Sequence, residues 1–364
     1  MTRQMQELLT EDGGAQDTRQ GVGLALSGGG YRAMLFHAGA LRRLNETGYL
    51  PRLDFVSSVS GGSIASGVLA SAWADLDFAP DGRAVNLEEK VVEPLCALAS
   101  RRLDVPCVLT GLLPGRSVSG CVEAAYREHL FGERTLQDLP DRPRFVFCAA
   151  NLQTASLFRF SKRYLADWRL GRVLAPRVQL ATAVAASSAF PPFLSPVVLR
   201  LPGQAWDPDP AYASTMDPAM REQIFLSDGG VYDNLGLEPI LKRCEKLLVS
   251  DGGGDVGHPR DVPRDWVRQL LRVTSVIDHQ VRNLRKRVLV DGYENGDVTG
   301  AYWGIRTDLS RSGLADPLPF SPARARALAD LPTRLSTVRG ATEDLVRWGY
   351  TVSDASLRQY DAVA

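Results

Sequence analysis

The chain reads FVSSVSGGSIASG at residues 55–67, and the expected fold is built outward from this stretch. Apolar and β-branched residues before Ser60 predict a buried strand, and the small residues after it predict a helix. A strand, a sharp turn and a helix in this order form a nucleophile elbow, whose usual pattern is Gly-x-Ser-x-Gly. Ser58 occupies the first glycine position and Gly62 the last. Ser60 is therefore a candidate nucleophile, while a plain serine- and glycine-rich turn is the structural alternative.

A second turn of small residues precedes the elbow by about thirty residues, the length of one βα unit. The chain reads VGLALSGGGYR at residues 22–32. The apolar part predicts a buried strand, and residues 33–44 have the apolar spacing of a helix. Because α/β sheets place their sites at the carboxyl ends of the strands, we expect this turn to lie beside the elbow.

Free backbone N–H groups at the start of a helix attract anions. A phosphate loop would end in Gly-Lys-Ser/Thr and a dinucleotide loop would read G-x-G-x-x-G, and this turn matches neither pattern. An oxyanion hole needs only backbone donors near a nucleophile, so Gly28, Gly29 and Gly30 are candidate donors. A tight structural turn is the alternative. Arg32 either supports this loop or offers its charge to an anionic substrate.

A carboxylate is the third candidate group. The stretch 224–236 predicts an apolar strand that ends at Asp228 before Gly-Gly, and the stretch 247–254 repeats the pattern with Asp251. Either aspartate could act as a base, and either could instead cap a turn. The residues themselves do not choose between Asp228 and Asp251.

Serine hydrolases usually have a base that takes the hydroxyl proton. The chain has four histidines, at positions 37, 129, 258 and 279. None ends an expected strand, and only His258 is a plausible member of a Ser-His-Asp triad. If no histidine serves, a buried carboxylate must take the proton directly, and the site is a Ser–Asp dyad.

Composition limits the classes of function. The 364 residues include 42 basic and 42 acidic side chains, a balance that argues against general nucleic-acid binding. Five scattered cysteines without a Cys-x-x-Cys pair indicate reduced thiols in a cytoplasmic protein rather than a disulfide framework or a zinc site. No run of 18 apolar residues occurs, so any membrane contact is expected to be peripheral. The polar residues 1–20 predict a disordered lead-in and not a signal peptide.

Two other stretches carry weaker signals. Residues 104–115 are apolar and rich in turns, which suits either an interior connection or a lid that touches a membrane. After Asp265 the apolar spacing predicts one long helix with a continuous stripe. The stripe consists of Trp266, Leu270, Val273, Ile277, Val281, Leu284 and Val288. Basic residues at 282–287 indicate a solvated face, with contact to anionic lipid as the alternative.

Three motifs in fixed order give a family resemblance. They are residues 27–32 (SGGGYR), 58–62 (SVSGG) and 228–230 (DGG). Together they resemble the patatin-like phospholipase family over roughly residues 21–255, and the segments 185–193 and 231–236 resemble it as well. The chain departs from the family pattern at Ala33 and Ser58, where glycine is usual, and both replacements are small.

The resemblance implies a three-layer α/β/α sandwich with a mainly parallel central sheet. It implies residues 21–255 as the catalytic core and residues 256–364 as a mostly helical C-terminal extension. It also implies hydrolysis of lipid acyl esters, of phospholipid or lysophospholipid, without metal or cofactor. Ser60 then corresponds to the nucleophile, Asp228 to the base and Gly28, Gly29 and Gly30 to the oxyanion loop, with Arg32 and Gly62 in support.

Two rival interpretations stay open. One is a Ser-His-Asp esterase that uses His258. The other is a non-catalytic protein of the same fold that binds a lipid or a partner. The predicted location is cytoplasmic, with peripheral membrane contact as an option.

Overall fold

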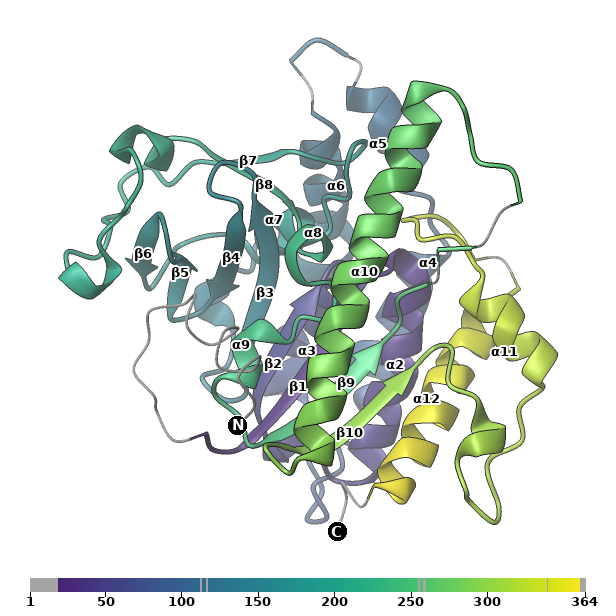
Figure 1. The fold of residues 1–364 in the computed structure, drawn as a ribbon. Helices are drawn as coiled ribbons and strands as arrows, with labels where there is room; N and C mark the ends of the chain where they lie inside the picture. Colours follow the sequence, from purple (N-terminus) through teal and green to yellow (C-terminus); the bar gives the residue numbers. More distant parts are fainter. Residues whose placement is uncertain are drawn as a thin grey trace.

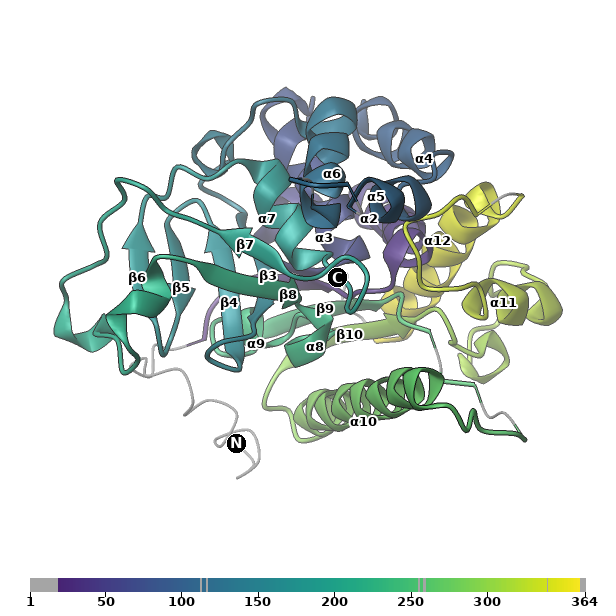
Figure 2. The same ribbon diagram turned by 90° about the horizontal axis from the view of Figure 1, so that it is seen from above.

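The structure, a computed structural model, describes residues 19–111, 113–115, 117–254, 256–257, 260–338 and 340–360. One mixed sheet of ten strands forms the centre, and helices cover both of its faces (Figures 1 and 2). The predicted α/β/α class is therefore confirmed. Residues 1–18 of the predicted lead-in lie outside the described residues.

The strands follow the apolar runs seen in the sequence. They are β1 (Val22–Leu26), β2 (Leu53–Val59), β3 (Arg144–Asn151), β4 (Ser156–Ser161), β5 (Tyr164–Asp167), β6 (Gly171–Leu174), β7 (Val197–Leu199), β8 (Ile224–Asp228), β9 (Lys246–Asp251) and β10 (Thr299–Gly304). β1, β2, β3, β8 and β9 are buried over nearly their whole length, as continuous apolar runs predict.

The helices alternate with strands in the first part of the chain and dominate the last part. They are α2 (Gly30–Glu46), α3 (Gly61–Ala72), α4 (Glu93–Ala99), α5 (Asp104–Gly111), α6 (Val118–Tyr126), α7 (Leu180–Ser187), α8 (Gly230–Asp233), α9 (Glu238–Leu241), α10 (Trp266–Glu294), α11 (Pro322–Ala329) and α12 (Thr342–Gln359). Among the described helices, none has the length and apolar character needed to cross a bilayer.

The sheet has a parallel half and an antiparallel half. Its order is β10-β9-β1-β2-β3-β4-β5-β6, and the pairs from β10 to β3 are parallel. The pairs from β3 to β6 are antiparallel, and so are the pairs of β8 with β3 and β7. The parallel half is the part that the sequence predicted. In the antiparallel half, β3 to β6 are joined by short hairpins without βα spacing, whereas β8 pairs with strands that are distant in the chain.

Helices α2, α3 and α12 form the core on one face of the sheet. Every residue of α2 from Gly30 to Leu41 is buried. α12 crosses α2 closely: a Cβ atom at Gly39 would lie 1.8 Å from Val346 O, and one at Gly349 would lie 1.9 Å from Phe36 O. Glycine at both positions is what lets the two backbones touch.

The C-terminal part of the chain is integrated with the core. β10 extends the sheet beside β9, and its Trp303 is fully buried. The segment before α12 reaches the glycine loop, where Tyr31 N donates to Arg334 O at 3.0 Å. A boundary near residue 255 stays a prediction, and residues 256–364 supply a strand as well as helices.

The cysteine interpretation was wrong for one pair. Cys107 and Cys121 form a disulfide across 14 residues, which links α5 to α6. Cys96, Cys148 and Cys244 are free thiols. Cysteine spacing could not reveal the pair, because only the packing of α5 on α6 brings the two thiols together. The premise of uniformly reduced thiols therefore fails.

Candidate active site

Ser60 lies on the turn between β2 and α3 in a strained backbone conformation. Its φ and ψ are 53° and −121°, and it is one of three described non-glycine residues with a positive φ. Side chains other than glycine avoid this region, and such strain persists where the surroundings enforce it. The elbow geometry expected from the sequence is thus present, with Ser60 at its apex.

The register of the strands brings Asp228 to the same place. β2 and β8 use successive parts of β3: Val59 pairs with Cys148, and Asp228 pairs with Ala149. β8 therefore continues where β2 ends, running in the opposite direction. The last residue of β8 meets the turn that follows the last residue of β2, so Asp228 and Ser60 lie together.

The electrostatics of Asp228 suit a base. Its carboxylate is buried, and the loss of hydration raises its pKa to about 7, against the smaller lowering effects of hydrogen bonds from Gly230 and Ser60. Oδ1 accepts a hydrogen bond from Gly230 N at 2.7 Å. Oδ2 is buried and has no partner of good geometry among the described residues. It is therefore the oxygen left to receive a proton from Ser60.

The glycine loop touches the elbow directly. Gly62 N donates to Ser27 O at 3.1 Å, and a Cβ atom at Gly28 would lie 3.2 Å from the Cβ of Ser60. Gly29 and Gly30 have positive φ values, 145° and 63°, which favour glycine. Sequence reasoning thus places the two turns side by side correctly.

The three candidate oxyanion donors are not equivalent. Gly28 N donates to the backbone carbonyl of Asn234 at 3.0 Å, so this donor is engaged within the protein. For the N–H groups of Gly29 and Gly30, the described residues provide no acceptor. These two groups are the ones that could bind a developing negative charge beside Ser60.

A methyl group at Gly61 of the elbow is expected to disrupt the close contact between the elbow and the glycine loop. In Gly61→Ala the new Cβ would lie 2.1 Å from Gly30 O, which is backbone and cannot swing away. We expect a loss of about 1–3 kcal/mol in unfolding free energy, measured by urea denaturation, together with loss of activity. Gly257→Ala is the control, because no described atom lies within 4 Å of its Cβ. Equal stability of the two variants would contradict this expectation.

Arg32 is committed to contacts within the protein. Its buried guanidinium donates through Nε to Gly252 O at 3.2 Å, through Nη2 to Thr333 Oγ1 at 3.0 Å, and through Nη1 to Leu331 O. Burial lowers its pKa to about 10. These contacts tie the glycine loop to the segments 252–254 and 331–334. Of its two predicted roles, support of the loop fits them.

Asp251 is placed differently from Asp228. It ends β9, which β1 separates from β2. Its Oδ2 accepts from Tyr302 Oη at 2.7 Å and its Oδ1 accepts from Gly253 N at 2.9 Å. Both oxygens are satisfied, and the strand order keeps them away from Ser60. The geometry thus separates two aspartates that the sequence could not.

Both ring nitrogens of His37 are engaged within the protein, so this histidine is not a base for Ser60. His37 is fully buried, with Nδ1 2.8 Å from Ser250 Oγ and Nε2 2.9 Å from Ser27 O. Burial lowers its pKa to about 4, so it is neutral and structural. His129 Nδ1 lies 3.7 Å from Glu128 Oε1, and the half-buried His279 lies in the middle of α10. His258 lies outside the described residues.

Residues that the sequence did not single out brace the elbow. Ser187, the last residue of α7, accepts from Ser60 N at both its carbonyl and its hydroxyl oxygen, each at 3.1 Å. Its carbonyl also accepts from Gly229 N at 3.3 Å. Its hydroxyl lies 2.7 Å from Ser63 Oγ. Ser187 therefore fixes the turns of both candidate catalytic residues, and only the small-residue character of the helix hinted at this.

Asn234 is a second such residue. Its side-chain oxygen fills the space beside two glycines: a Cβ at Gly28 would lie 2.2 Å from it, and a Cβ at Gly230 would lie 2.8 Å from it. Asn234 thus joins the glycine loop to the turn that carries Asp228.

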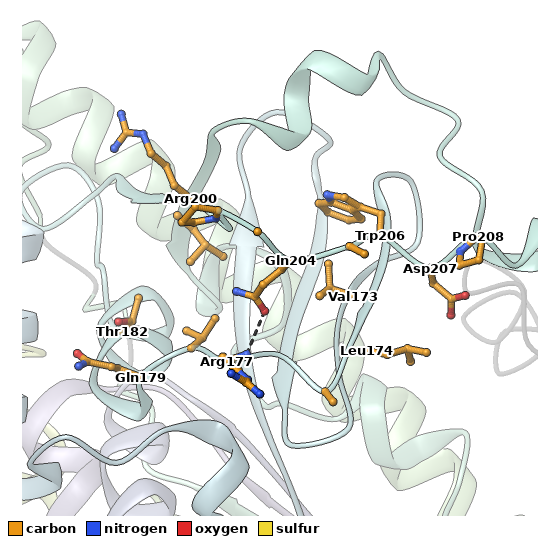
Figure 3. A pocket seen from close by; sticks show the side chains of 16 residues that line it. Val173, Leu174, Arg177, Gln179, Thr182, Arg200, Gln204, Trp206, Asp207 and Pro208 are labelled. Carbon is orange, nitrogen blue, oxygen red and sulfur yellow. Dashed lines mark hydrogen bonds between the residues drawn. The ribbon is translucent and has the colours of Figure 1, made fainter.

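A pocket of about 760 Å³ lies elsewhere, between β6, α7 and the segment 199–208 (Figure 3). Val173, Val178 and Leu199 line it together with Trp206, and Gln204 Oε1 accepts from Arg177 N at 3.0 Å. Neither Ser60, Asp228 nor the glycine loop is among its lining residues.

Within the described chain, no group of three or more His, Cys, Asp or Glu side chains could hold a metal ion.

The family follows from a match that spans the site. Residues 24–241 match the family model described as patatin-like phospholipase, which is more than half of the chain. The chain belongs to the patatin-like phospholipase family. This range contains the glycine loop, the elbow and Asp228, in the same order as the three motifs on which the family resemblance was based. No curated protein sequence matches the chain significantly.

A solved phospholipase structure shows the same fold at low identity. Human GIVD cytosolic phospholipase A2 in complex with methyl gamma-linolenyl fluorophosphonate has a TM-score of 0.52 and 14% identity, with 100% of this chain and 64% of that chain covered. VipD from Legionella pneumophila has a TM-score of 0.38 and 15% identity, with 95% and 67% covered. The likeness to the phospholipase concerns the fold alone, and this patatin-like chain spans about two thirds of that protein.

Proposed function

We propose that this patatin-like protein hydrolyses acyl esters of lipids through Ser60 and Asp228. The proposal is supported by the position of Ser60 and Asp228, which lie next to each other at the ends of β2 and β8. There a strained serine faces a buried carboxylate whose pKa is about 7 and whose Oδ2 has no other partner among the described residues. Family membership supports a lipid-hydrolysing enzyme, and the dyad and the substrate are the proposed refinements.

The reaction follows from this geometry. Oδ2 of Asp228 accepts the proton of Ser60 Oγ, and Oγ attacks the ester carbonyl carbon. The tetrahedral oxyanion accepts hydrogen bonds from Gly29 N and Gly30 N, each donor typically contributing about 3 kcal/mol. When the intermediate collapses, the departing alcohol takes the proton from Asp228 and leaves an acyl-enzyme. Water, deprotonated by Asp228, then releases the fatty acid and restores Ser60.

The buried environment makes a carboxylate adequate for this task. An ordinary aspartate, with a pKa near 3.8, is too weak a base at neutral pH. Burial raises the pKa of Asp228 to about 7, close to the working pH, where a general base is most effective. A histidine is then unnecessary. In the rival triad with His258, His258→Gln would abolish activity, whereas the dyad predicts little loss.

Phospholipid or lysophospholipid is the proposed substrate class, with neither metal nor cofactor. The cytoplasmic location stays a prediction, and the Cys107–Cys121 disulfide weakens its premise because disulfides are rare in reducing compartments.

Labelling with a fluorophosphonate tests the proposal. Such probes react with activated serines, so the purified protein should be labelled at Ser60, as located by peptide mass spectrometry. Asp228→Asn should label far more slowly. Labelling at another serine, or none on a folded protein, would overturn the proposed nucleophile and favour a binding role for this fold.

A further inference from the structure

Helix α10 exposes much of the continuous apolar stripe that the sequence predicted for it. The Trp, Leu and Ile side chains of the stripe are 77% exposed at Trp266, 60% at Leu270, 57% at Ile277 and 49% at Leu284. Of its 29 residues, only Arg282, Leu289 and Gly292 are buried. A helix with this pattern normally buries its apolar side, so an exposed stripe indicates a surface that meets something apolar.

The exposed side of the helix carries no charge in its N-terminal half. Since an α-helix has about 3.6 residues per turn, positions 266, 270, 273 and 277 share one side. Arg268 and Arg272 fall on the opposite side. Val267 and Val276 widen the apolar side and are also exposed. The start of α10 therefore presents an uncharged apolar surface.

The N-terminal half of α10 stands beside the candidate site. Lower on the helix, Arg285 donates to Glu238 at 3.2 Å and lies 3.6 Å from Asp233 of α8, and the charge of Asp278 raises the pKa of Asp228. From there the helix rises past the carboxyl ends of β1, β2 and β9 (Figure 1). Its apolar start therefore projects beyond the edge of the sheet where Ser60 lies.

A second apolar projection flanks the site from the other face of the sheet. Val105 and Leu109 of α5, and Leu113 just after it, are exposed. α5 reaches the same height as the start of α10 in Figure 1, and in Figure 2 the two helices lie on opposite sides of the sheet. The sequence analysis left the segment 104–115 between an interior connection and a surface that touches a membrane, and its exposure favours the second.

Exposed side chains next to the catalytic candidates complete the surface. Phe190 and Phe193 follow α7, and Asp228 N donates to the adjacent Ala189 O at 2.9 Å. Val231, three residues after Asp228, is exposed as well. We call the exposed apolar residues of 105–113, 190–193, 231 and 262–277 the apolar rim.

We propose that the apolar rim docks this protein on the surface of a lipid bilayer, with the start of α10 and the α5 segment inserted on either side of Ser60. The inference rests on the proposed function, because a lipid ester must then reach Ser60 from a bilayer. Trp266 at the tip suits the interface, where an apolar ring with a polar N–H is favoured.

A planar partner explains the arrangement better than a second copy of the chain does. The rim comes from four separate segments around one site, so a flat, fluid surface can meet all of them together. A stable protein–protein interface takes about 20–30 residues from each side, more than the stripe of α10 offers by itself. The uncharged side also lacks the charge pairs that fix register between helices.

Vesicle binding tests the proposal with catalysis removed. Ser60→Ala protein should co-sediment with phosphatidylcholine vesicles and remain bound in about 1 M salt, which screens charge and not apolar insertion. Adding Trp266→Asp and Leu270→Asp should weaken binding at least about tenfold, because each loses an inserted apolar side chain. The control Leu284→Asp lies about 27 Å farther along the helix and should change binding less than twofold. Circular dichroism checks that all variants are folded.

Three outcomes would overturn the proposal. Ser60→Ala protein that does not bind vesicles is one, and equal binding by the tip variant and the control is another. The third is light scattering that shows a dimer which the tip variant dissociates, because the stripe would then belong to a second copy. Hydrolysis of a soluble short-chain ester by the unmodified chain is measured separately. Its absence would remove the proposed function while leaving the binding result valid.

Discussion

Replacing Ser60 by alanine is expected to lower the rate of acyl-ester hydrolysis by at least about a thousandfold. In the proposed mechanism the hydroxyl forms the covalent intermediate, so its removal would leave water as the sole nucleophile. Substrate contacts do not depend on one oxygen atom, so KM should change little and the loss should appear in kcat. Steady-state kinetics on a soluble ester measure both values.

Ser66→Ala provides the matched control for this loss. Ser66 lies one and a half turns later in α3, is equally buried, and bonds to the hydroxyl of Ser58 at 2.7 Å. Removing it deletes a buried hydroxyl without touching the reaction, and we expect kcat to fall by less than about fivefold, since an ordinary buried hydrogen bond contributes about 1 kcal/mol. Comparable losses in both variants would mean that Ser60 acts only through the fold of the elbow.

The parts of the candidate site that are formed by a short, continuous stretch of sequence could be predicted. The elbow at residues 58–62 and the glycine loop at 27–32 each carry their own turn signals, and the βα spacing places them on neighbouring strands. The choice of Asp228 over Asp251 had no such local signal and rested on resemblance. The physical reason is the register of β8 along β3, which is a long-range pairing that no short pattern encodes.

The rest of the fold was unpredictable for a related reason. The apolar spacing of α10 shows that one side of the helix is apolar. It does not show whether that side packs on the core or is exposed. Cys107 and Cys121 look like separate thiols because only the packing of α5 on α6 brings them together. Ser187 looks like one small residue among many, although its position at the end of α7 lets it hold two turns.

The apolar rim and the proposed dyad are linked by the exclusion of water from Asp228. A buried base keeps a pKa near 7 only while bulk water is excluded from it, because full hydration would return that pKa toward its ordinary value, although the single water that releases the fatty acid must still enter. A bilayer pressed against the rim would exclude water at the same edge of the sheet. We therefore expect docking and catalysis to support each other on vesicle substrates, whereas soluble esters depend on the dyad alone.

Replacing Asp228 by asparagine is expected to lower kcat by about a thousandfold or more. The amide keeps the shape of the side chain, and its oxygen can still accept from Gly230 N. It cannot take the proton of Ser60, so the nucleophile is no longer activated. Asp251→Asn is the control, because Asp251 lies two strands away with both oxygens occupied. A larger loss in the control would assign the base to Asp251.

The pH dependence of kcat/KM also tests the assignment of Asp228 as the base. The proposed reaction needs the carboxylate form of Asp228, whose pKa is raised to about 7 by burial. We expect kcat/KM of the unmodified chain to rise about tenfold per unit below that pKa and to level off above it. The residual activity of Asp228→Asn should lack this rise. A profile in the unmodified chain that is flat between about pH 5 and 8 would contradict Asp228 as the base.

Stability should move in the opposite direction from activity. The pKa of Asp228 is higher in the folded chain than its ordinary value of 3.8, so the folded state binds the proton more tightly. Its contribution to stability is full below about pH 4 and is lost as the pH rises through 7. Asp228→Asn has no charge to bury, so at about pH 8 it should be more stable than the unmodified chain by on the order of 1–4 kcal/mol. Below about pH 4 the two proteins should unfold alike, and urea denaturation at both pH values measures the difference. An inactive variant that is also less stable at the higher pH would show that Asp228 is retained for structure rather than for proton transfer.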